Sequence, residues 1–255
     1  GMNVEGSYEG VVFDHCSDSM ISGVRVRDLN GVALELTSCY LVRVENSGIR
    51  DCGSHGILVN YSVGVSMSGN MLQSCGDESV LLTHSRDCSL QGNQVLYGGS
   101  HGVRLELSNF NVIENNVLRG SEKNGLFLEV SYYNAISGNQ VFDSGNWGMF
   151  MSSSSDHNTV TGNSVSSSGY DGIRVDQSLG NSITGNSVLD SGWGGMIVYD
   201  SDDTVVSGNV VDSCFYSRIS VYNSNHVVVS GNTFKWADEH GIQIHHPTPA
   251  TVDAV

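Results

Sequence analysis

Two glutamates, Glu106 and Glu129, are the residues whose type and spacing point most directly to chemistry. They lie one period apart in a sequence repeat described below, so their backbones are expected to be about 4.8 Å apart. Retaining glycosidases use two carboxyl groups about 5–5.5 Å apart, and like charges at that distance raise one of the two pKa values. We therefore predict acid and base roles for Glu106 and Glu129, with His101 as a third catalytic residue. Adjacent repeats would impose this spacing on any acid pair, so an ordinary solvated pair is the alternative.

Arginines, acids and aromatic rings recur on the same expected surface as the two glutamates. Aromatic faces stack on sugar rings, and the guanidinium forks of arginines hold hydroxyls or carboxylates. The alternative is a solvated face with ion pairs, for example Arg104 with Glu129 and Arg174 with Asp176. The predicted substrate-binding residues are Arg104, Phe127, Phe150, Arg174, Asp176 and Tyr199.

A second polar column comes just before the first glycine of each repeat and contains His55, Glu78 and His101 in consecutive repeats. These side chains could transfer a proton or bind a metal. Polar residues are also what turns ordinarily contain, and His55 and His101 are two repeats apart. We therefore predict no metal site and no cofactor.

A short sequence repeat is the element that must position these side chains. A Gly-Asn pair recurs at a nearly constant step along the chain, with Asn115-Asn116 taking one of the positions. A fixed period of about 23 residues indicates a solenoid, in which each repeat buries its apolar face only by stacking on its neighbours. The pairs are Gly69-Asn70, Gly92-Asn93, Gly138-Asn139, Gly162-Asn163, Gly185-Asn186, Gly208-Asn209 and Gly231-Asn232.

Apolar and polar residues alternate within each repeat, as at Ile173 and Val175. Short alternating runs rich in Val and Ile, separated by Gly, Asn, Asp and Ser, are typical of strands and turns. The sequence therefore predicts an all-β fold, a parallel β-helix of about eleven turns with three short strands in each turn of about 23 residues. The aligned asparagines are expected to form hydrogen-bonded ladders at the corners.

One uninterrupted pattern runs from residue 10 to residue 246, which predicts a single domain there. Residues 1–9 are expected to be a lead-in, and residues 247–255 a C-terminal tail. Neither end has an obvious cap, although the terminal repeats of a solenoid need one to cover their open sheet edges. We therefore expect homo-oligomerisation or adjoining domains to cover the ends.

The formal net charge of −16 argues against a nucleic-acid partner and against anionic membrane surfaces, because neither would meet a basic surface. No apolar run approaches the length of about 18 residues expected of a membrane span. No targeting signal is recognised in the sequence.

The repeat consensus D-S-G-x-x-G-I-x-V-x-x-S-x-x-N-x-I-x-G-N-x-V, seen from Asp190 to Asn209, resembles the right-handed parallel β-helix repeat of the pectin-lyase-like superfamily. It is most similar to the NosD-type repeats and to the carbohydrate-binding and sugar-hydrolase repeats. The resemblance covers residues 10–246. It implies a right-handed β-helix with a polysaccharide or glycan as partner, and an extracellular, periplasmic or cell-surface location.

The activity implied by this resemblance is broad, because such families include polysaccharide lyases, glycoside hydrolases and epimerases as well as members without known catalysis. The Asp-Pro-His motif of the epimerases is missing, since residues 97–102 read YGGSHG. The repeats also lack the long loops that the resemblance leads us to expect around a catalytic cleft. The alternative to a carbohydrate-active protein is a non-catalytic binding module, or a structural spacer of a larger surface or secreted protein.

Overall fold

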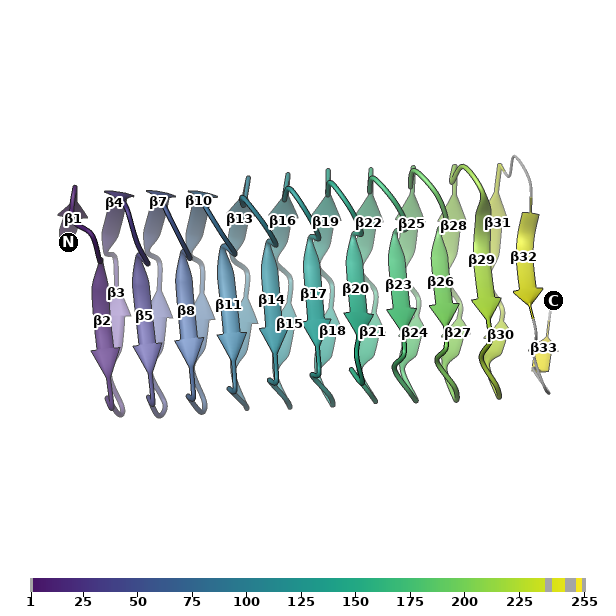
Figure 1. Ribbon diagram of the computed structural model, residues 1–255, viewed down its shortest axis with the longest axis horizontal. Coiled ribbons are helices and arrows are strands. Elements are labelled where there is room, and N and C mark those ends of the chain that lie inside the picture. The colour runs from purple at the N-terminus through teal and green to yellow at the C-terminus, as the bar shows by residue number, and fades with distance from the viewer. Residues whose placement is uncertain (1, 237–239, 246–250, 254–255) are drawn as a thin grey trace.

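The computed structural model describes residues 2–236, 240–245 and 251–253. Every regular element in these residues is a short β-strand, and the strands form three parallel sheets of 11 strands each. The described residues contain no helix that could cross a membrane. The three sheets run along the length of an elongated stack (Figure 1).

We call the three sheets A, B and C, and each takes every third strand of the chain. Sheet A contains β1 (Asn3–Glu5), β4 (Arg25–Leu29), β7 (Gly48–Cys52), β10 (Met71–Cys75), β13 (Gln94–Leu96), β16 (Val117–Arg119), β19 (Gln140–Phe142), β22 (Ser164–Ser166), β25 (Ser187–Leu189), β28 (Val210–Asp212) and β31 (Thr233–Lys235). Sheet B contains β2 (Val11–Asp14), β5 (Leu34–Thr37), β8 (Ile57–Asn60), β11 (Val80–Thr83), β14 (Val103–Glu106), β17 (Leu126–Glu129), β20 (Met149–Ser152), β23 (Ile173–Asp176), β26 (Met196–Tyr199), β29 (Ser217–Tyr222) and β32 (His240–His245). Sheet C contains β3 (Met20–Ser22), β6 (Arg43–Glu45), β9 (Ser66–Ser68), β12 (Ser89–Gln91), β15 (Val112–Glu114), β18 (Ala135–Ser137), β21 (Thr159–Thr161), β24 (Ser182–Thr184), β27 (Val205–Ser207), β30 (Val228–Ser230) and β33 (Thr251–Asp253).

This arrangement confirms the predicted parallel β-helix with three strands in each turn. In Figure 1 the sheet B strands run downward at the front, the chain returns upward behind them, and it advances to the right. A coil that turns and advances in this sense is right-handed, which is the hand that parallel strand connections adopt in nearly all proteins. Two strands lie outside residues 10–246: β1 falls in the expected lead-in and β33 in the expected tail.

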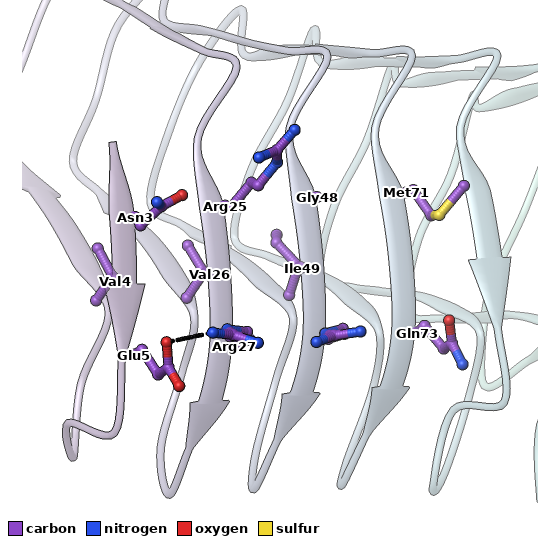
Figure 2. A pocket seen from close by; sticks show the side chains of 11 residues that line it. Asn3, Val4, Glu5, Arg25, Val26, Arg27, Gly48, Ile49, Met71 and Gln73 are labelled. Atoms are coloured by element: carbon purple, nitrogen blue, oxygen red, sulfur yellow. Dashed lines mark hydrogen bonds and ion pairs between the residues drawn. The ribbon is translucent and has the colours of Figure 1, made fainter. Parts of the chain in front are cut away.

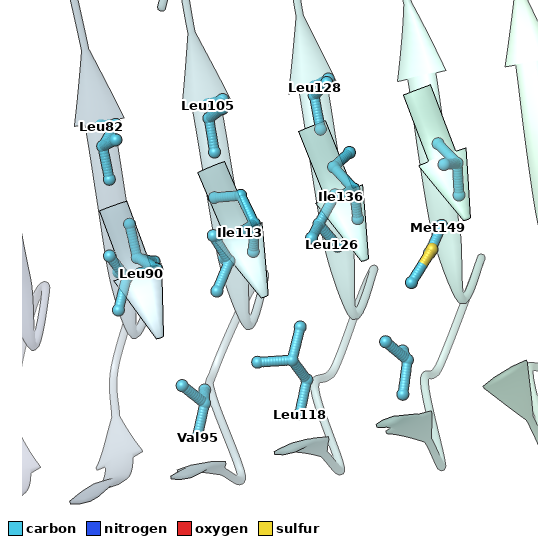
Figure 3. Close-up of a cluster of buried hydrophobic side chains, with 14 of the residues drawn as sticks. Leu82, Leu90, Val95, Leu105, Ile113, Leu118, Leu126, Leu128, Ile136 and Met149 are labelled. Carbon is cyan, nitrogen blue, oxygen red and sulfur yellow. The ribbon is translucent and has the colours of Figure 1, made fainter. Parts of the chain in front are cut away.

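The core fills the interior with one column of aliphatic side chains for each inward position. Leu82, Leu105 and Leu128 from sheet B stack along the axis, and Leu90, Ile113 and Ile136 from sheet C do the same (Figure 3). Each residue pairs with the residue one turn away, for example Leu105 with Leu128. A side chain one turn on therefore has the same orientation, and the surfaces of the rod are columns of residues spaced by one repeat.

The Gly-Asn corners between sheets C and A form the predicted asparagine ladder. Each asparagine amide donates to the Oδ1 of the next, for example Asn116 Nδ2 to Asn139 Oδ1 at 3.0 Å. The same amide donates to the backbone carbonyl of Leu90 at 2.9 Å, so this buried polar group is fully bonded. The preceding glycine has a positive φ, 63° at Gly138, which glycine adopts without steric cost.

The glycine that precedes most of the sheet B strands has a different role, which is close packing. A Cβ atom on Gly172 would lie 2.2 Å from Cγ1 of Val188 and 2.9 Å from the carbonyl oxygen of Gly195. No side chain fits at that distance, so the repeated glycine holds the corner tight and fixes where the next sheet B strand begins.

Candidate functional site

The outward face of sheet B carries the predicted site residues, with His101 at the corner that precedes β14. In most of the four-residue strands of this sheet the first and third side chains are buried and the fourth is more exposed, as in β23. The register places Glu106 beside Glu129. Arg104, Phe127, Phe150 and Arg174 hold the same position in successive strands, and Asp176 pairs with Tyr199.

Arg104 joins the two glutamates for which acid and base roles are predicted. Its Nη2 atom lies 2.6 Å from Glu129 Oε2 and 3.2 Å from Glu106 Oε2. Because both carboxylate oxygens contact the same nitrogen atom, they lie no farther from each other than the sum of these two distances. The ion pair between Arg104 and Glu129, the alternative interpretation of this surface, is present in the structure.

Glu78 is a third carboxylate beside Arg104. Its Oε1 lies 3.7 Å from Arg104 Nη1, and its Oε2 lies 3.1 Å from Nδ1 of His55. Burial favours the protonated acid, but the His55 imidazole and backbone hydrogen bonding outweigh burial and lower the pKa of Glu78 to about 2. Glu78 is therefore a carboxylate at neutral pH and adds to the negative charge around Arg104.

His101 is buried and neutral at physiological pH. Burial disfavours the charged imidazolium and lowers the pKa of His101 to about 4, although Glu78 nearby opposes this shift. The backbone N–H of Asn124 donates to its Nδ1 at 3.2 Å. Because Nδ1 is the acceptor, the proton of the neutral ring is on Nε2. In this state the Nε2 atom of His101 can act only as a hydrogen-bond donor and is not available as a base.

Aromatic rings lie next to His101 on the outward face of sheet B. Phe127 stacks on Phe150 with ring centroids 5.2 Å apart, and Trp147 packs on Phe150 at 4.5 Å. Phe127 is only 9% exposed, because His101, Arg104 and Phe150 surround it. Phe127 therefore supports its neighbours, and its own face is not free for a ligand.

Arg174 is the centre of a second charged cluster, three strands along sheet B from Arg104. Its Nη2 lies 3.0 Å from Asp176 and its Nη1 3.4 Å from Asp171. Asp171 also accepts hydrogen bonds from Trp147 Nε1 at 3.1 Å and from the Gly194 backbone N–H at 2.9 Å. Burial nevertheless raises the pKa of Asp171 above its usual value. The guanidinium group lies 5.7 Å from the ring of Tyr199.

A pocket of about 250 Å³ opens on sheet B next to this cluster. Two pairs of aromatic residues line it, Trp193 with Tyr216 from the corner before the strands and Tyr199 with Tyr222 from the strand ends. The space between them exists because the intervening positions carry small or aliphatic side chains. The complete lining is Asp171, Arg174, Trp193, Gly194, Ile197, Tyr199, Tyr216, Ser217, Ser220 and Tyr222.

Of these lining residues, the sequence prediction included only Arg174 and Tyr199. Trp193, Tyr216 and Tyr222 were missed, although the spacing gave a signal: Tyr170, Trp193 and Tyr216 follow one another at steps of one repeat. They lie in one column, where the Tyr216 N–H donates to the Trp193 carbonyl oxygen at 2.8 Å. The pocket lies two to five strands beyond the predicted acid pair.

The described residues contain no group of three or more His, Cys, Asp or Glu side chains that could hold a metal ion. What sheet B offers is two arginines surrounded by carboxylates, and aromatic faces on both sides of a hollow. Such groups can stack on a ring and exchange hydrogen bonds with its substituents.

Solved structures with a similar fold include proteins of several activities. The A-module of the mannuronan C-5 epimerase AlgE6 of Azotobacter vinelandii has a TM-score of 0.71 at 16% identity, over 98% of this chain and 80% of that chain. PfbA, a surface adhesin of Streptococcus pneumoniae, has a TM-score of 0.74 at 14% identity, over 94% and 72%. The GH136 lacto-N-biosidase of Eubacterium ramulus has a TM-score of 0.72 at 9% identity, over 97% and 61%. At these identities the likeness shows the fold alone.

A search of curated protein sequences returns no match for this chain. A family model does match it, and its description is "Right handed beta helix region". The match covers residues 9–165 and 152–253, which is nearly the whole chain. Together with the fold, it confirms the resemblance to the pectin-lyase-like superfamily. The chain therefore belongs to the right-handed β-helix family.

Proposed function

We propose that this protein binds a carbohydrate on the outward face of sheet B, with one sugar ring in the pocket between Trp193–Tyr216 and Tyr199–Tyr222. The observation that carries the proposal is the pocket itself, which has aromatic residues on two sides and a charged cluster at one end. Its volume of about 250 Å³ is below the ~300–1,000 Å³ typical of pockets for drug-sized ligands. It suits one unit of a longer molecule that continues along the rod.

The charges on this face favour a neutral, hydroxyl-rich sugar. On this face of sheet B, two arginines are outnumbered by five acidic side chains, so an acidic sugar would be repelled. Carboxylates accept hydrogen bonds from sugar hydroxyls, and an arginine donates hydrogen bonds to the hydroxyl oxygens. The five acids are Glu78, Glu106, Glu129, Asp171 and Asp176.

Similar folds support this proposal, because they occur in an epimerase of mannuronan, a lacto-N-biosidase and a surface adhesin. The support is general: these names indicate carbohydrate chemistry and surface attachment for those proteins, and no particular sugar for this one.

Binding to a panel of neutral oligosaccharides tests the proposal. We expect Trp193→Ala and Tyr216→Ala each to weaken binding on the order of tenfold or more, because each removes a stacking face. Tyr8→Ala is the matched control, since Tyr8 is exposed and lies outside the pocket lining. If no neutral glycan binds, or if the pocket variants bind as the control does, the proposal is wrong.

A second proposal is catalysis by Glu106 and Glu129, with His101 nearby. One observation favours it: an oxygen of each carboxylate contacts the same Arg104 nitrogen, which is compatible with the ~5–5.5 Å separation of retaining glycosidases. Two observations weigh against it, namely the Arg104 bridge between the acids and the Nε2-protonated state of His101.

Product analysis separates the two proposals. Catalysis predicts that the wild type releases products from a glycan that it binds. Glu106→Gln and Glu129→Gln would each lower that rate by at least about a hundredfold, since each removes an acid–base group. If the wild type binds the glycan through Trp193 but releases no product, only the binding function is supported.

We also propose an extracellular, periplasmic or cell-surface location, which the periplasmic epimerase AlgG and the adhesin PfbA among the similar structures support.

The terminal strands of the three sheets each have one pairing edge without a neighbour among the described strands. Homo-oligomerisation or adjoining domains would cover these edges, because uncovered strand edges promote aggregation.

A further inference from the structure

A second hollow lies on sheet A, near the N-terminal end of the rod and away from the strands of the sheet B site. Its volume is about 490 Å³, and it crosses β1, β4, β7 and β10 (Figure 2). Two outward rows of side chains border it, Asn3, Arg25, Gly48 and Met71 in one row, and Glu5, Arg27, Arg50 and Gln73 in the other. The inward residues between the rows are aliphatic.

The hollow is basic in an otherwise acidic protein. Three of the 11 Lys and Arg residues line it, against the single carboxylate of Glu5, while the whole chain carries −16. Arg25 forms no ion pair with any residue that the structure describes. Every other exposed arginine in the part of the chain that the structure describes has a carboxylate within 4.0 Å. The groove therefore presents an unpartnered positive charge.

Arg27 and Arg50 place two more positive charges side by side. They are register partners on β4 and β7, so their backbones are about 4.8 Å apart on the same face. Like charges in directly opposed positions are destabilising. Glu5 compensates Arg27 at 2.6 Å, but the nearest carboxylate to Arg50 is Asp51, at 3.8 Å. An anion between the rows would relieve this repulsion.

Gly48 creates the space that such an anion would occupy. A Cβ atom there would meet no atom within 4 Å, and its φ is not positive, so a larger residue could stand at this position. The Arg25 side chain extends toward β7 at Gly48 (Figure 2). The missing side chain leaves the Arg25 guanidinium open to the same hollow that Arg27 and Arg50 border.

We propose that this groove on sheet A binds an acidic oligosaccharide through its carboxylate groups, at a site separate from the neutral-sugar pocket on sheet B. The planar guanidinium fork matches a carboxylate with two parallel hydrogen bonds. The row of positive charge along the rod matches a chain with one carboxylate on each successive ring. The amides of Asn3 and Gln73 are positioned at the two ends of the groove for hydroxyl groups.

A nucleic acid would present the same row of anionic groups with a much higher charge density. Duplex DNA carries about one negative charge per 1.7 Å, and the −16 chain would repel it along the rest of the rod. Only three arginines are available to offset that repulsion. A sparsely charged glycan is therefore the favoured occupant.

Calorimetric titration of the whole protein with a hexamer of galacturonic acid tests this inference, with neutral maltohexaose and a single-stranded hexadeoxynucleotide as comparison ligands. We expect the uronate to bind best, and more weakly as salt is added. The double variant Arg25→Gln/Arg50→Gln should bind it at least about tenfold more weakly, because charge-assisted hydrogen bonds are lost. Gly48→Met should also weaken binding by filling the hollow, whereas Glu5→Gln should strengthen it by freeing Arg27.

The control Arg86→Gln removes an exposed, paired arginine elsewhere and should leave uronate binding unchanged. Trp193→Ala should also leave it unchanged, which separates this site from the sheet B pocket. Unchanged circular dichroism spectra would show that each variant is folded. The inference is overturned if the uronate binds no better than maltohexaose, if the nucleotide binds more tightly, or if Trp193→Ala removes uronate binding. Equal binding by the double variant and the Arg86 control would also overturn it.

Discussion

Two arginines determine what the side chains of sheet B can do. Arg104 and Arg174 each lie among carboxylates, with contacts of 2.6 Å to Glu129 and 3.0 Å to Asp176. The carboxylate oxygens around these arginines accept hydrogen bonds and the guanidinium groups donate them, which suits recognition of hydroxyl groups. An acid catalyst would instead need a carboxyl group that stays protonated near neutral pH. The residue geometry therefore favours binding.

The buried imidazole of His101 makes the stability of the protein depend on pH. Its pKa is lowered to about 4 in the folded protein, against about 6.5 in an unfolded chain. Between these values the unfolded state binds more protons, so stability falls as pH drops from about 6.5 to about 4 and this loss is complete below pH 4. We expect the loss to be on the order of 3 kcal/mol.

Urea unfolding at several pH values, for the wild type and His101→Gln, measures this effect. Gln can accept the Asn124 N–H and does not titrate, so the variant should show a shallower decline between pH 6.5 and 4. Glu78, with a pKa of about 2, still loses its contribution as pH falls from about 4.5 through 2 in both proteins. Identical pH profiles for the two proteins above pH 4 would contradict the account of His101.

Alternation and period made part of the site predictable at the residue scale. They placed Arg104, Glu106 and Glu129 on one outward face and anticipated the ion pair of Arg104 with Glu129, which is present. They did not reveal the pocket, because its hollow depends on the small residues Gly194 and Ser220 between larger ones. Its outer wall comes from corner residues such as Trp193, whose direction strand alternation does not specify.

At the scale of the elements, the corners between strands position everything else. The asparagine ladder bonds each C-to-A corner to the next from Asn70 onward, as from Asn116 to Asn139, and tight glycines precede most of the sheet B strands. These corners keep the turn length constant, so the outward columns stay in register along the rod. The period of the sequence predicted this regularity, because Gly and Asn recur where a corner needs them.

Two glycine variants test this division of roles. Gly172→Ala should destabilise the protein by about 1–3 kcal/mol, since its Cβ would lie 2.2 Å from Val188. Gly48→Ala should change stability by no more than about 0.5–1 kcal/mol, because its Cβ would meet nothing within 4 Å. Thermal unfolding midpoints of the two variants compare them directly. Equal midpoints would show that the sheet B corner is looser than the structure indicates.

At the scale of the whole molecule, the rod carries two grooves of opposite chemical character on different sheets. Sheet B offers aromatic residues and an excess of carboxylates near its C-terminal half, and sheet A offers arginines near the N-terminal end. The composition gives only the net charge of the whole chain, −16, and not how the charges are distributed over the surface. The separation became visible only with the register, because Arg27 and Arg50 belong to different turns and meet only when the turns stack.

The fold was predictable because one period governs nearly all of the chain. The function was less predictable from the sequence, because a solenoid gives every surface column the same spacing, whether the column binds a ligand or only faces solvent. What distinguishes the sheet B pocket is the break in regularity, where small residues interrupt a column of large ones between β23 and β29.

A crystal structure of the protein with a neutral oligosaccharide chosen from the binding panel would show where on the rod the sugar binds. We expect a sugar ring between Trp193–Tyr216 and Tyr199–Tyr222, with hydroxyl groups within hydrogen-bonding distance of Arg174 or Asp171. A well-ordered sugar bound elsewhere on the rod, with this pocket empty, would contradict the proposal.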